Sequence, residues 1–335
     1  MTVGLGLIGA GRIGTNHAAI VAHEVPGARL VAVADPVEIA AKRLAAELDA
    51  DAVDVDTLLG RADVDGVLIT APARSHTELV VAAAAAGKHV FCEKPMAVTL
   101  ADADRAIAAA ERAGVVLQVG FNRRFAPDWA AARALLDGGR LGTPRLLRSV
   151  TRDPGGFNPA RVAPDTIFLE TLIHDFDTLR FLNPGADPVE VYAMADALVE
   201  PAWRDRGLLD TATVLVRFAN GATGTAEACF EAAYGYDVRG EVFGSRGMVS
   251  MGGGPRSSLV LSTASGRAIE TVRGDVELFA DAYAAELAEF AEAVREGRTP
   301  AVTGHDARRA LAVALAAIAS VESGAPVDVA TGVVR

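Results

Sequence analysis

Residues 9–14 read Gly9-Ala10-Gly11-Arg12-Ile13-Gly14, between a stretch typical of a β-strand (residues 2–8) and one typical of a helix (residues 13–22). In a G-x-G-x-x-G turn the first glycine permits a tight turn, the second lets the backbone approach a pyrophosphate, and the third lets helix and strand pack closely. The free N–H groups at the helix N-terminus favour the phosphates. The stretch therefore predicts a dinucleotide-binding unit.

Asp35 extends this prediction to the kind of dinucleotide. It follows the second expected strand, residues 30–34, about twenty residues after the last glycine of the turn. A carboxylate at this place accepts hydrogen bonds from the ribose hydroxyls and repels the 2′-phosphate of NADP. Pro36 and Val37 come next, so no arginine follows immediately to pair with such a phosphate. The sequence favours NAD; the alternative is a glycine-rich turn followed by a solvated aspartate.

The first 120 residues alternate short apolar runs with alanine-rich helical stretches. Further strands are expected at 66–70, 89–92 and 115–119, and further helices at 37–48, 75–86 and 100–113. Alternation at this spacing predicts βαβ units around a parallel sheet, and continuous apolar strands are typical of a sheet covered on both faces. The predicted fold of residues 1–121 is α/β, a doubly wound Rossmann sheet.

The pattern changes after Gly120. Helices are expected at 127–136, 166–182, 276–296 and 306–323, and short alternating strands between 189 and 271, with Asn220-Gly221 as a hairpin turn. Gly297 fits the position after the third of these helices, and Asp306 can cap the fourth. Strands that follow helices predict an α+β domain with a large, mostly antiparallel sheet. We therefore assign residues 122–335 to a second domain.

Length and composition exclude several classes of protein. The chain has 335 residues, 51% of them hydrophobic and 22% charged, which suits two globular domains and argues against disorder. Its formal net charge of -11 repels nucleic-acid phosphates and anionic lipid. The longest apolar run, near residues 310–319, is too short to span a bilayer. We predict neither a nucleic-acid partner nor a membrane partner.

The two cysteines, Cys92 and Cys229, fit a reducing compartment better than a disulfide scaffold. The first residues lack the basic segment and cleavage-like site of a secretory signal. A cytoplasmic location is therefore expected. The histidines are scattered and form no His-x₃-His spacing, and no Cys-x₂-Cys pair occurs, so no metal site is expected.

A second motif, Cys92-Glu93-Lys94-Pro95, follows the expected strand 89–92. Together with residues 9–14 it resembles the glucose–fructose oxidoreductase/inositol dehydrogenase (Gfo/Idh/MocA) family. Later stretches resemble the inositol 2-dehydrogenase subgroup and occur in the order found in that family: 120–125, 151–154, 173–177, 234–239, 241–244 and 303–310. The resemblance covers nearly the whole chain.

The resemblance implies both a fold and an activity. It implies a Rossmann domain followed by a domain whose open sheet commonly packs against another subunit, giving a homodimer or homotetramer. It also implies an NAD-dependent dehydrogenase that oxidises a ring hydroxyl of a cyclic polyol, such as myo- or scyllo-inositol, to a ketone. The alternatives are an aminocyclitol or pyranose dehydrogenase, a glycosidase of the same family that uses NAD without net redox change, and a non-catalytic NAD-binding regulator.

Lys94 is the first catalytic candidate. It stands at the carboxyl end of a predicted parallel strand, where ligand crevices form in open α/β sheets. Its ammonium group can hydrogen-bond the reacting oxygen or relay the proton of that oxygen. The resemblance implies a cis bond between Lys94 and Pro95, and we expect Glu93 to position the turn or the nicotinamide end. The alternative is a solvated surface lysine.

His174 and Glu170 are the other catalytic candidates. A histidine suits reversible proton exchange near neutrality, and a carboxylate four residues earlier on a helix shares its face and can orient the imidazole. The resemblance implies Asp and His at these two places, together with a lysine, so Glu170 departs from the subgroup by one methylene. Such a shift of ~1.5 Å leaves three explanations: a pocket rebuilt for Glu170, a substrate other than myo-inositol, or impaired activity.

The resemblance also assigns candidates for binding. Arg123, Asp153 and Tyr236 match positions that line the substrate pocket; Arg123 could equally form an ion pair between domains. The cofactor candidates are the residues of the turn and of the strand ends: Gly9, Gly11, Arg12, Ile13, Gly14, Asp35, Pro72, His76, Glu93 and Lys94.

Overall fold

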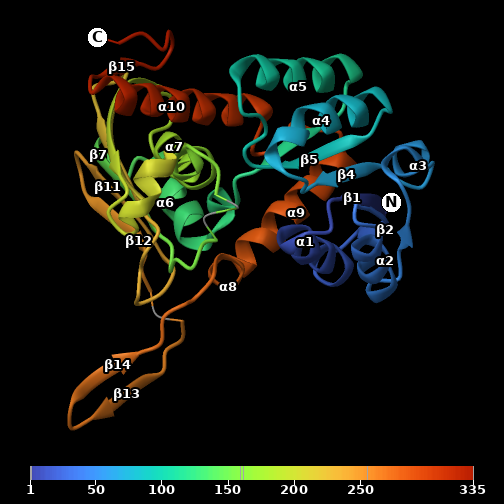
Figure 1. Cartoon of the computed structure of the whole chain (residues 1–335), viewed down its shortest axis with the longest axis horizontal. Helices are drawn as coiled ribbons and strands as arrows, with labels where there is room; N and C mark the ends of the chain where they lie inside the picture. Colours follow the sequence, from blue (N-terminus) through green and yellow to red (C-terminus); the bar gives the residue numbers. More distant parts are fainter. Residues whose placement is uncertain (1, 159, 161, 255, 335) are drawn as a thin grey trace. The chain divides into compact units, whose positions relative to one another are not determined.

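In the computed structural model, strand β1 (Val3–Ile8) lies inside a six-stranded sheet with the order β3-β2-β1-β4-β5-β6 (Figure 1). All five pairings in this sheet are parallel. Its other strands are β2 (Ala28–Ala34), β3 (Asp51–Ala52), β4 (Gly66–Ile69), β5 (His89–Glu93) and β6 (Leu117–Gly120). This order confirms the predicted doubly wound Rossmann sheet.

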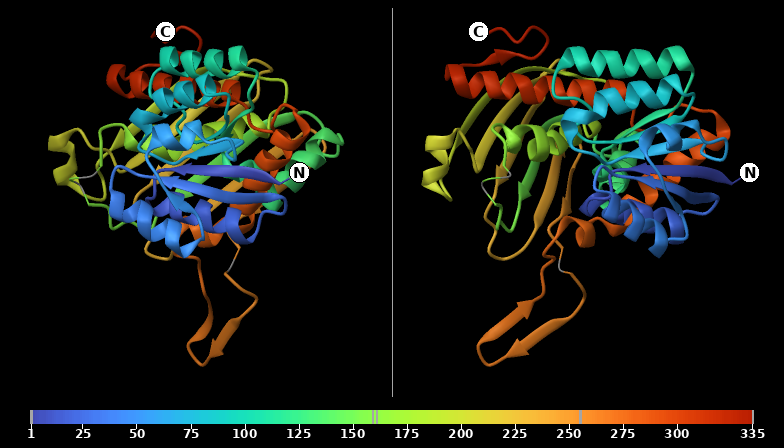
Figure 2. Two further views of the ribbon diagram at one scale, coloured as in Figure 1. Left: turned by 90° about the vertical axis from the view of Figure 1, so that its right-hand side faces the viewer. Right: turned by 45° about the vertical axis from the view of Figure 1, so that its right-hand side comes forward.

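Helices cover both faces of this sheet, as Figures 1 and 2 show: α4 and α5 lie on one face, and α1 and α9 on the other. The helices are α1 (Arg12–His23), α2 (Glu38–Glu47), α3 (Val55–Gly60), α4 (His76–Ala85), α5 (Leu100–Ala113) and α9 (Ala280–Glu296). The central strands are fully apolar and buried, since Leu5, Val67 and Phe91 have no exposed surface. Burial on both faces explains the continuous apolar runs in the sequence.

The structure describes residues 2–158, 160, 162–254 and 256–334. The chain divides into unit 1, residues 1–125 and 281–311, and unit 2, residues 126–280 and 312–335. The expected division at 121/122 differs from this one, because it assigned everything after residue 121 to the second domain. Residues 281–311 return to unit 1 because Tyr283 packs against the ring of His17, and Phe290 against Phe91.

Unit 2 is built on a seven-stranded sheet with the order β12-β11-β7-β10-β9-β8-β15. Only the β7–β10 pairing is parallel, so the predicted, mostly antiparallel sheet is confirmed. The strands are β7 (Pro144–Arg152), β8 (Pro188–Asp196), β9 (Thr211–Phe218), β10 (Thr223–Cys229), β11 (Asp237–Gly244), β12 (Met248–Gly252) and β15 (Val327–Asp328). Strand β7 was not expected from the sequence.

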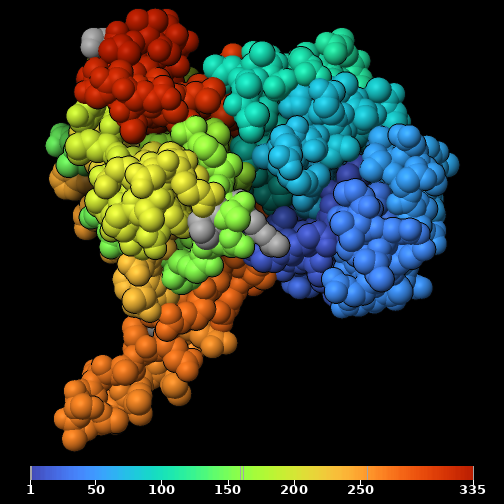
Figure 3. All heavy atoms as spheres, in the orientation of Figure 1, coloured from blue at the N-terminus to red at the C-terminus, as the bar shows by residue number. Residues whose placement is uncertain are grey.

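One face of this sheet packs on helices. The side chains on the other face are exposed or half-buried, so these alternate with buried side chains along the strands. Helix α6 (Pro127–Asp137) and helix α7 (Ile173–Phe181) lie along the covered face, where Ser320 of α10 (Gly304–Ser323) accepts a hydrogen bond from the β8 amide of Ala193. A two-stranded hairpin, β13 (Val260–Thr263) and β14 (Gly266–Ile269), stands out from the rest of unit 2 (Figure 3).

The helix ends refine three expectations. The helix expected at 276–296 is broken after α8 (Asp275–Leu278), and α9 begins at Ala280 and ends before Gly297, which has φ +63° as expected. Helix α10 begins at Gly304, and the amide of Asp306 donates to the hydroxyl of Thr303 while its carboxylate accepts from Thr303. Thr303 thus provides the cap that the sequence assigned to Asp306. Within the described residues, no helix is both long and apolar enough to cross a bilayer.

Candidate active site

The carboxyl ends of the parallel strands bring the predicted cofactor residues of unit 1 to one edge of the sheet. Gly9 follows β1, Asp35 follows β2, Pro72 follows β4 and Lys94 follows β5. Strands that run parallel and in order must end at the same edge. In an open α/β sheet this edge, outside the carboxyl ends of the strands, is where ligands bind.

The three glycines of the turn have three different surroundings. Gly9 has φ +110°, a conformation that favours glycine, and its carbonyl accepts a hydrogen bond from the Thr70 hydroxyl at 2.7 Å. A Cβ on Gly14 would come within 1.9 Å of the Gly9 carbonyl oxygen, so β1 and α1 need a glycine there. A Cβ on Gly11 would meet nothing within 4 Å. Gly9 and Gly14 are therefore required by the fold itself, whereas the protein leaves open space beside Gly11.

The N-terminus of α1 suits a pyrophosphate in that open space. Gly11 is the N-cap residue of α1; it makes no side-chain capping bond, and the first turn carries no acidic residue. Gly11 and Arg12 are exposed, and Ile13 is half-buried. Helix N–H groups without side-chain partners, together with the helix dipole, stabilise a bound anion. The residues present therefore fit a dinucleotide.

Asp35 is held in place by backbone N–H groups on both sides. The amide of Ala10 donates to Oδ2 at 2.6 Å, and the amide of Val37 donates to Oδ1 at 2.7 Å. The Ala10 bond links the carboxylate directly to the glycine turn. The half-buried Asp35 carboxylate is therefore held beside the glycine turn, at the carboxyl end of β2.

His76 supports the turn that carries Lys94. Its ring nitrogens lie 2.8 Å from the Pro95 carbonyl oxygen and 2.7 Å from the Ala71 carbonyl oxygen, and the residue is only 1% exposed. It therefore ties the end of β4 to the turn after β5, while the neighbouring Pro72 is exposed. The Lys94–Pro95 bond is cis, as expected, and Lys94 is half-buried.

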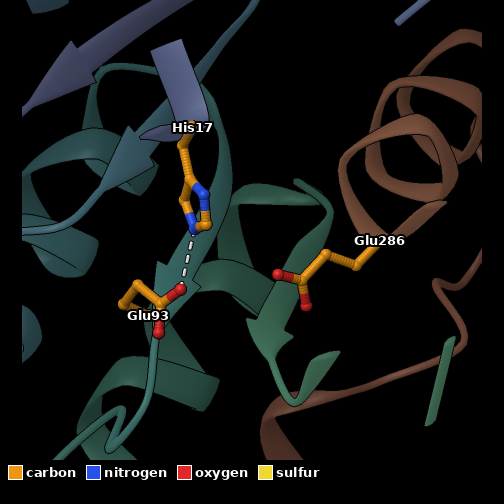
Figure 4. Close-up of side chains that lie close together, drawn as sticks. All are labelled: His17, Glu93 and Glu286. Carbon is orange, nitrogen blue, oxygen red and sulfur yellow. Dashed lines mark hydrogen bonds and ion pairs between the residues drawn. The ribbon is translucent and has the colours of Figure 1, made fainter. Parts of the chain in front are cut away.

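Three ionisable side chains from three distant segments, His17, Glu93 and Glu286, meet in the core of unit 1 (Figure 4). His17 Nε2 lies 2.7 Å from Glu93 Oε1, and the amide of Lys94 donates to Glu93 Oε2 at 3.0 Å. Glu286 of α9 points its carboxylate toward this pair, and one potential ligand atom from each of His17, Glu93 and Glu286 lies within 4.8 Å of the others. Scattered spacing in the sequence had predicted no such grouping.

Burial and neighbouring charges shift the pKa values of the two carboxylates of this cluster in opposite directions. Burial by itself raises the pKa of Glu93, but the hydrogen bond from His17 and the positive charge of Lys94 bring that pKa below its ordinary value. Burial, and then the charge of Glu93, raise the pKa of Glu286 well above the ordinary 4.5. Burial also raises the pKa of the Cys92 thiol, so this cysteine is an inert, apolar side chain.

In unit 2, Asp175 anchors the helix that carries His174. Its carboxylate accepts hydrogen bonds from Ser149 at 2.5 Å and from Thr151 at 2.8 Å, both on β7. The segment Ile167–Leu172 before α7 is a π-helix, with bonds from i to i+5. Glu170 lies in this π-helical segment and His174 in the α-helix that follows it, and both residues are half-buried.

Asp153 and Tyr236 lie at the same end of neighbouring strands. Arg152 of β7 is paired with Asp237 of β11, so the next residue of one strand and the preceding residue of the other stand beside each other. Asp153 accepts a hydrogen bond from the Gly155 amide at 3.0 Å. Unit 2 therefore groups Asp153 and Tyr236, whereas Arg123 is buried in unit 1, with 3% exposure.

Comparisons with known proteins agree with this arrangement. Residues 3–121 match a family described as "Oxidoreductase family, NAD-binding Rossmann fold", and residues 129–250 match the "GFO/IDH/MocA C-terminal domain". The chain belongs to the Gfo/Idh/MocA oxidoreductase family. The predicted family, the Rossmann domain and NAD as the cofactor are thereby confirmed.

Individual Gfo/Idh/MocA proteins are similar over nearly the whole chain. A myo-inositol 2-dehydrogenase of Thermotoga maritima is 38% identical, covering 95% of this chain and 96% of its own length. A scyllo-inositol 2-dehydrogenase (NAD⁺) of Bacillus subtilis is 36% identical, covering 96% and 95%. The crystal structure of a scyllo-inositol dehydrogenase from Lactobacillus casei with NAD(H) and scyllo-inositol bound is 28% identical, with a TM-score of 0.94 and coverage of 99% and 100%.

The fixed carboxylate of Asp35 leads to a prediction about the choice of cofactor in this family member. Asp35→Asn keeps one acceptor oxygen but removes the negative charge, so the ratio of NAD to NADP affinity should fall by about 10–100-fold. Calorimetric titration with both dinucleotides measures this ratio. Asp56→Asn, at an exposed acidic residue of α3, is the matched control. An unchanged ratio would place the ribose away from Asp35.

Two residues of the buried cluster were not identified from the sequence. His17 was indistinguishable from a packing or capping residue of the first helix. Glu286 did have a signal, because it lies on the same helical stripe as the buried Tyr283 and Phe290. A charged residue on an apolar stripe indicates a buried charged group, but the groups that surround it come from other parts of the chain.

Proposed function

We propose that this protein is an NAD-dependent dehydrogenase that oxidises a ring hydroxyl of a cyclic polyol, inositol first, to a ketone. The observation that carries the proposal is the position of Lys94, half-buried at the sheet edge that also holds the dinucleotide turn. Similarity over nearly the full length to myo- and scyllo-inositol dehydrogenases supports the substrate class. A relative crystallised with NAD(H) and scyllo-inositol supports the pairing of cofactor and polyol.

The proposed reaction divides between cofactor and protein. The glycine turn and Asp35 would hold NAD, which would supply the acceptor for the hydride of the carbon that bears the hydroxyl. His174 takes the hydroxyl proton, Lys94 stabilises negative charge on the oxygen as that proton leaves, and Glu170 orients the imidazole. The products are a ketone, NADH and one proton. Arg123, Asp153 and Tyr236 bind the remaining ring hydroxyls.

A screen for NADH absorbance tests the proposal. The purified protein is incubated with NAD or NADP and a panel of inositol stereoisomers, aminocyclitols and free aldoses. We expect NADH to accumulate with at least one inositol and little NADPH with any compound. NADH formed only from an aminocyclitol or an aldose would move the substrate to that class. In a parallel incubation with NAD and a chromogenic glycoside, release of the chromogen without net NADH would instead identify the redox-neutral glycosidase.

We expect the substrate pocket to be shaped for the longer side chain of Glu170 rather than for an aspartate at this position. Shortening it to aspartate should withdraw the carboxylate from its partner, and a displacement of about 1 Å can cost on the order of 100-fold in rate. We expect Glu170→Asp to lower kcat/KM for the best polyol by about 10–100-fold. Steady-state kinetics measure this, with Glu322→Asp, an exposed residue of α10, as the control. A gain in activity would instead show that Glu170 impairs the enzyme.

We also propose that the open sheet face of unit 2 packs against a second copy of the chain, as a homodimer or within a homotetramer. Leu146, Met194, Leu215 and Phe243 are each more than 40% exposed. Strand pairing puts all four on one face of the sheet. An apolar face of this kind is typical of an interface. Light scattering of the purified protein measures the assembly.

Both cysteines are free thiols, which suits the cytoplasmic location that we predict.

A further inference from the structure

Glu286 has an unusual environment. Its side chain is completely buried, and within the described part of the chain neither carboxylate oxygen has a hydrogen-bond partner. Its backbone carbonyl accepts a hydrogen bond from Gln118 of β6 at 2.7 Å, which fixes this turn of α9 against the sheet. The carboxylate faces His17 and Glu93, as Figure 4 shows. A buried polar group without a partner is costly, so its state requires an explanation.

A negative charge on Glu286 is poorly accommodated. Glu93, within 4.8 Å, already uses both of its carboxylate oxygens, one toward His17 and one toward the Lys94 amide. Two buried anions at such a separation repel each other strongly, and one of them takes up a proton. Glu93 keeps its charge because it has the two partners. Glu286 is the member of the pair that accepts the proton.

We propose that Glu286 is a neutral carboxylic acid in the folded protein and acts as a positioning residue for Lys94. Its neutrality leaves Glu93 as the only anion among the three clustered side chains, and Glu93 is the group that holds the Lys94 amide. The role in positioning rests on the proposed dehydrogenase activity; the neutral state does not. Glu286 on α9 thus acts on the turn that begins at Lys94 through Glu93, whose carboxylate accepts the hydrogen bond from the Lys94 amide.

Among the described residues, the titratable groups that meet the Glu286 carboxylate are His17 of α1 and Glu93 of β5. Tyr283, one turn earlier on α9, packs on the ring of His17, and the charge of Lys94 acts on Glu93. Burial and the charge of Glu93 both raise the pKa of Glu286. The folded protein therefore keeps a proton that the unfolded chain loses above the ordinary pKa of 4.5. The stability that this proton contributes is complete below that pH and is lost as pH rises toward the folded pKa.

The first test compares wild type with Glu286→Gln, which mimics the neutral acid. Denaturant unfolding is measured at several values between about pH 5 and pH 7. Because the wild-type folded state binds one more proton, its unfolding equilibrium constant relative to that of the variant should rise about tenfold per pH unit. The control is Glu289→Gln on the same helix, where the hydrogen bond from Arg298 lowers the pKa of Glu289, so no slope is expected in this window.

Two outcomes overturn the neutral state. One is a pH-independent difference between wild type and Glu286→Gln, since it means that Glu286 is ionised in the folded protein as it is in the unfolded chain; if the glutamine variant does not fold, Glu286→Leu replaces it in the same comparison. The other is a divalent cation found by elemental analysis at about one per chain and absent from Glu286→Gln, because a bound cation would then take the place of the proton.

The second test addresses positioning. Glu286→Gln keeps a neutral polar group, whereas Glu286→Leu removes it. Both variants lack an ionisable group at position 286, so we expect both to lose the fall in kcat at alkaline pH that ionisation of Glu286 beside Glu93 causes in wild type, with NAD affinity unchanged. Identical pH profiles of kcat in wild type and both variants would leave Glu286 a merely structural residue. If no polyol yields NADH even with wild type, the dehydrogenase proposal fails, and the unfolding experiment still decides the protonation state.

Discussion

Lys94→Met should reduce NADH formation from the best polyol by about 10²–10⁴-fold, the range over which a positioned proton-transfer group acts. Methionine keeps most of the length of the lysine side chain but carries no charge and no donor. Its sulfur cannot stabilise negative charge on the reacting oxygen. NAD affinity should change little, because the glycine turn and Asp35 lie on other strands of the sheet.

The measurement pairs steady-state kinetics with calorimetric titration of NAD. Lys42→Met is the matched control, since Lys42 is exposed on α2 and pairs only with Glu38 among the described residues. The control should retain wild-type turnover and wild-type NAD affinity. Undiminished turnover in Lys94→Met would remove Lys94 from the mechanism and leave His174 to act without it.

The second large effect is a difference in stability between alanine substitutions at two glycines of the same turn. Gly14→Ala places a Cβ within 1.9 Å of the Gly9 carbonyl oxygen and 2.6 Å of Thr70 Oγ1, so the backbone of β1 or α1 must move. Overpacking against backbone should lower the free energy of unfolding by about 3 kcal/mol or more. Gly11→Ala meets only open space and has φ -74°, so its cost in stability should stay under about 1 kcal/mol, the scale of an N-cap change.

Binding of NAD should show the reverse pattern at Gly11. A methyl group there occupies the space that a pyrophosphate needs for close backbone approach, so NAD affinity should fall on the order of 10–100-fold although the protein stays folded. Thermal unfolding and NAD titration of the two variants measure the contrast. Normal NAD affinity in Gly11→Ala would mean that the phosphates do not approach this turn.

Much of unit 1 could be predicted because its signals are local. Each strand is a continuous apolar run, and each glycine of residues 9–14 answers a steric requirement within the same βα unit. Asp35 was identified from its distance along the chain, because the length of one helix fixes where the second parallel strand must end. The cis Lys94–Pro95 bond came from the family resemblance, since neighbouring residues alone do not decide it.

Unit 2 was predicted less completely. Strand β7 was missed because Arg145, Arg148 and Arg152 interrupt its apolar pattern, and the strand pairs with β10 and β11, which come more than seventy residues later. The helix around Glu170 and His174 was expected, but its π-helical turn was not. Helix periodicity assumes regular bonds, and contacts with the sheet decide whether a turn departs from them.

The sequence by itself determined the family, the dinucleotide turn and the parallel sheet of unit 1, and it supplied the candidate residues for the chemistry, because each depends on neighbours along the chain or on a motif of fixed spacing. Only the tertiary structure decided that residues 281–311 join the first unit, that His76 bonds two loops and that Glu286 meets Glu93. These facts depend on which buried surfaces pack together. A charge buried beside another charge takes its state from groups that the chain order keeps far apart.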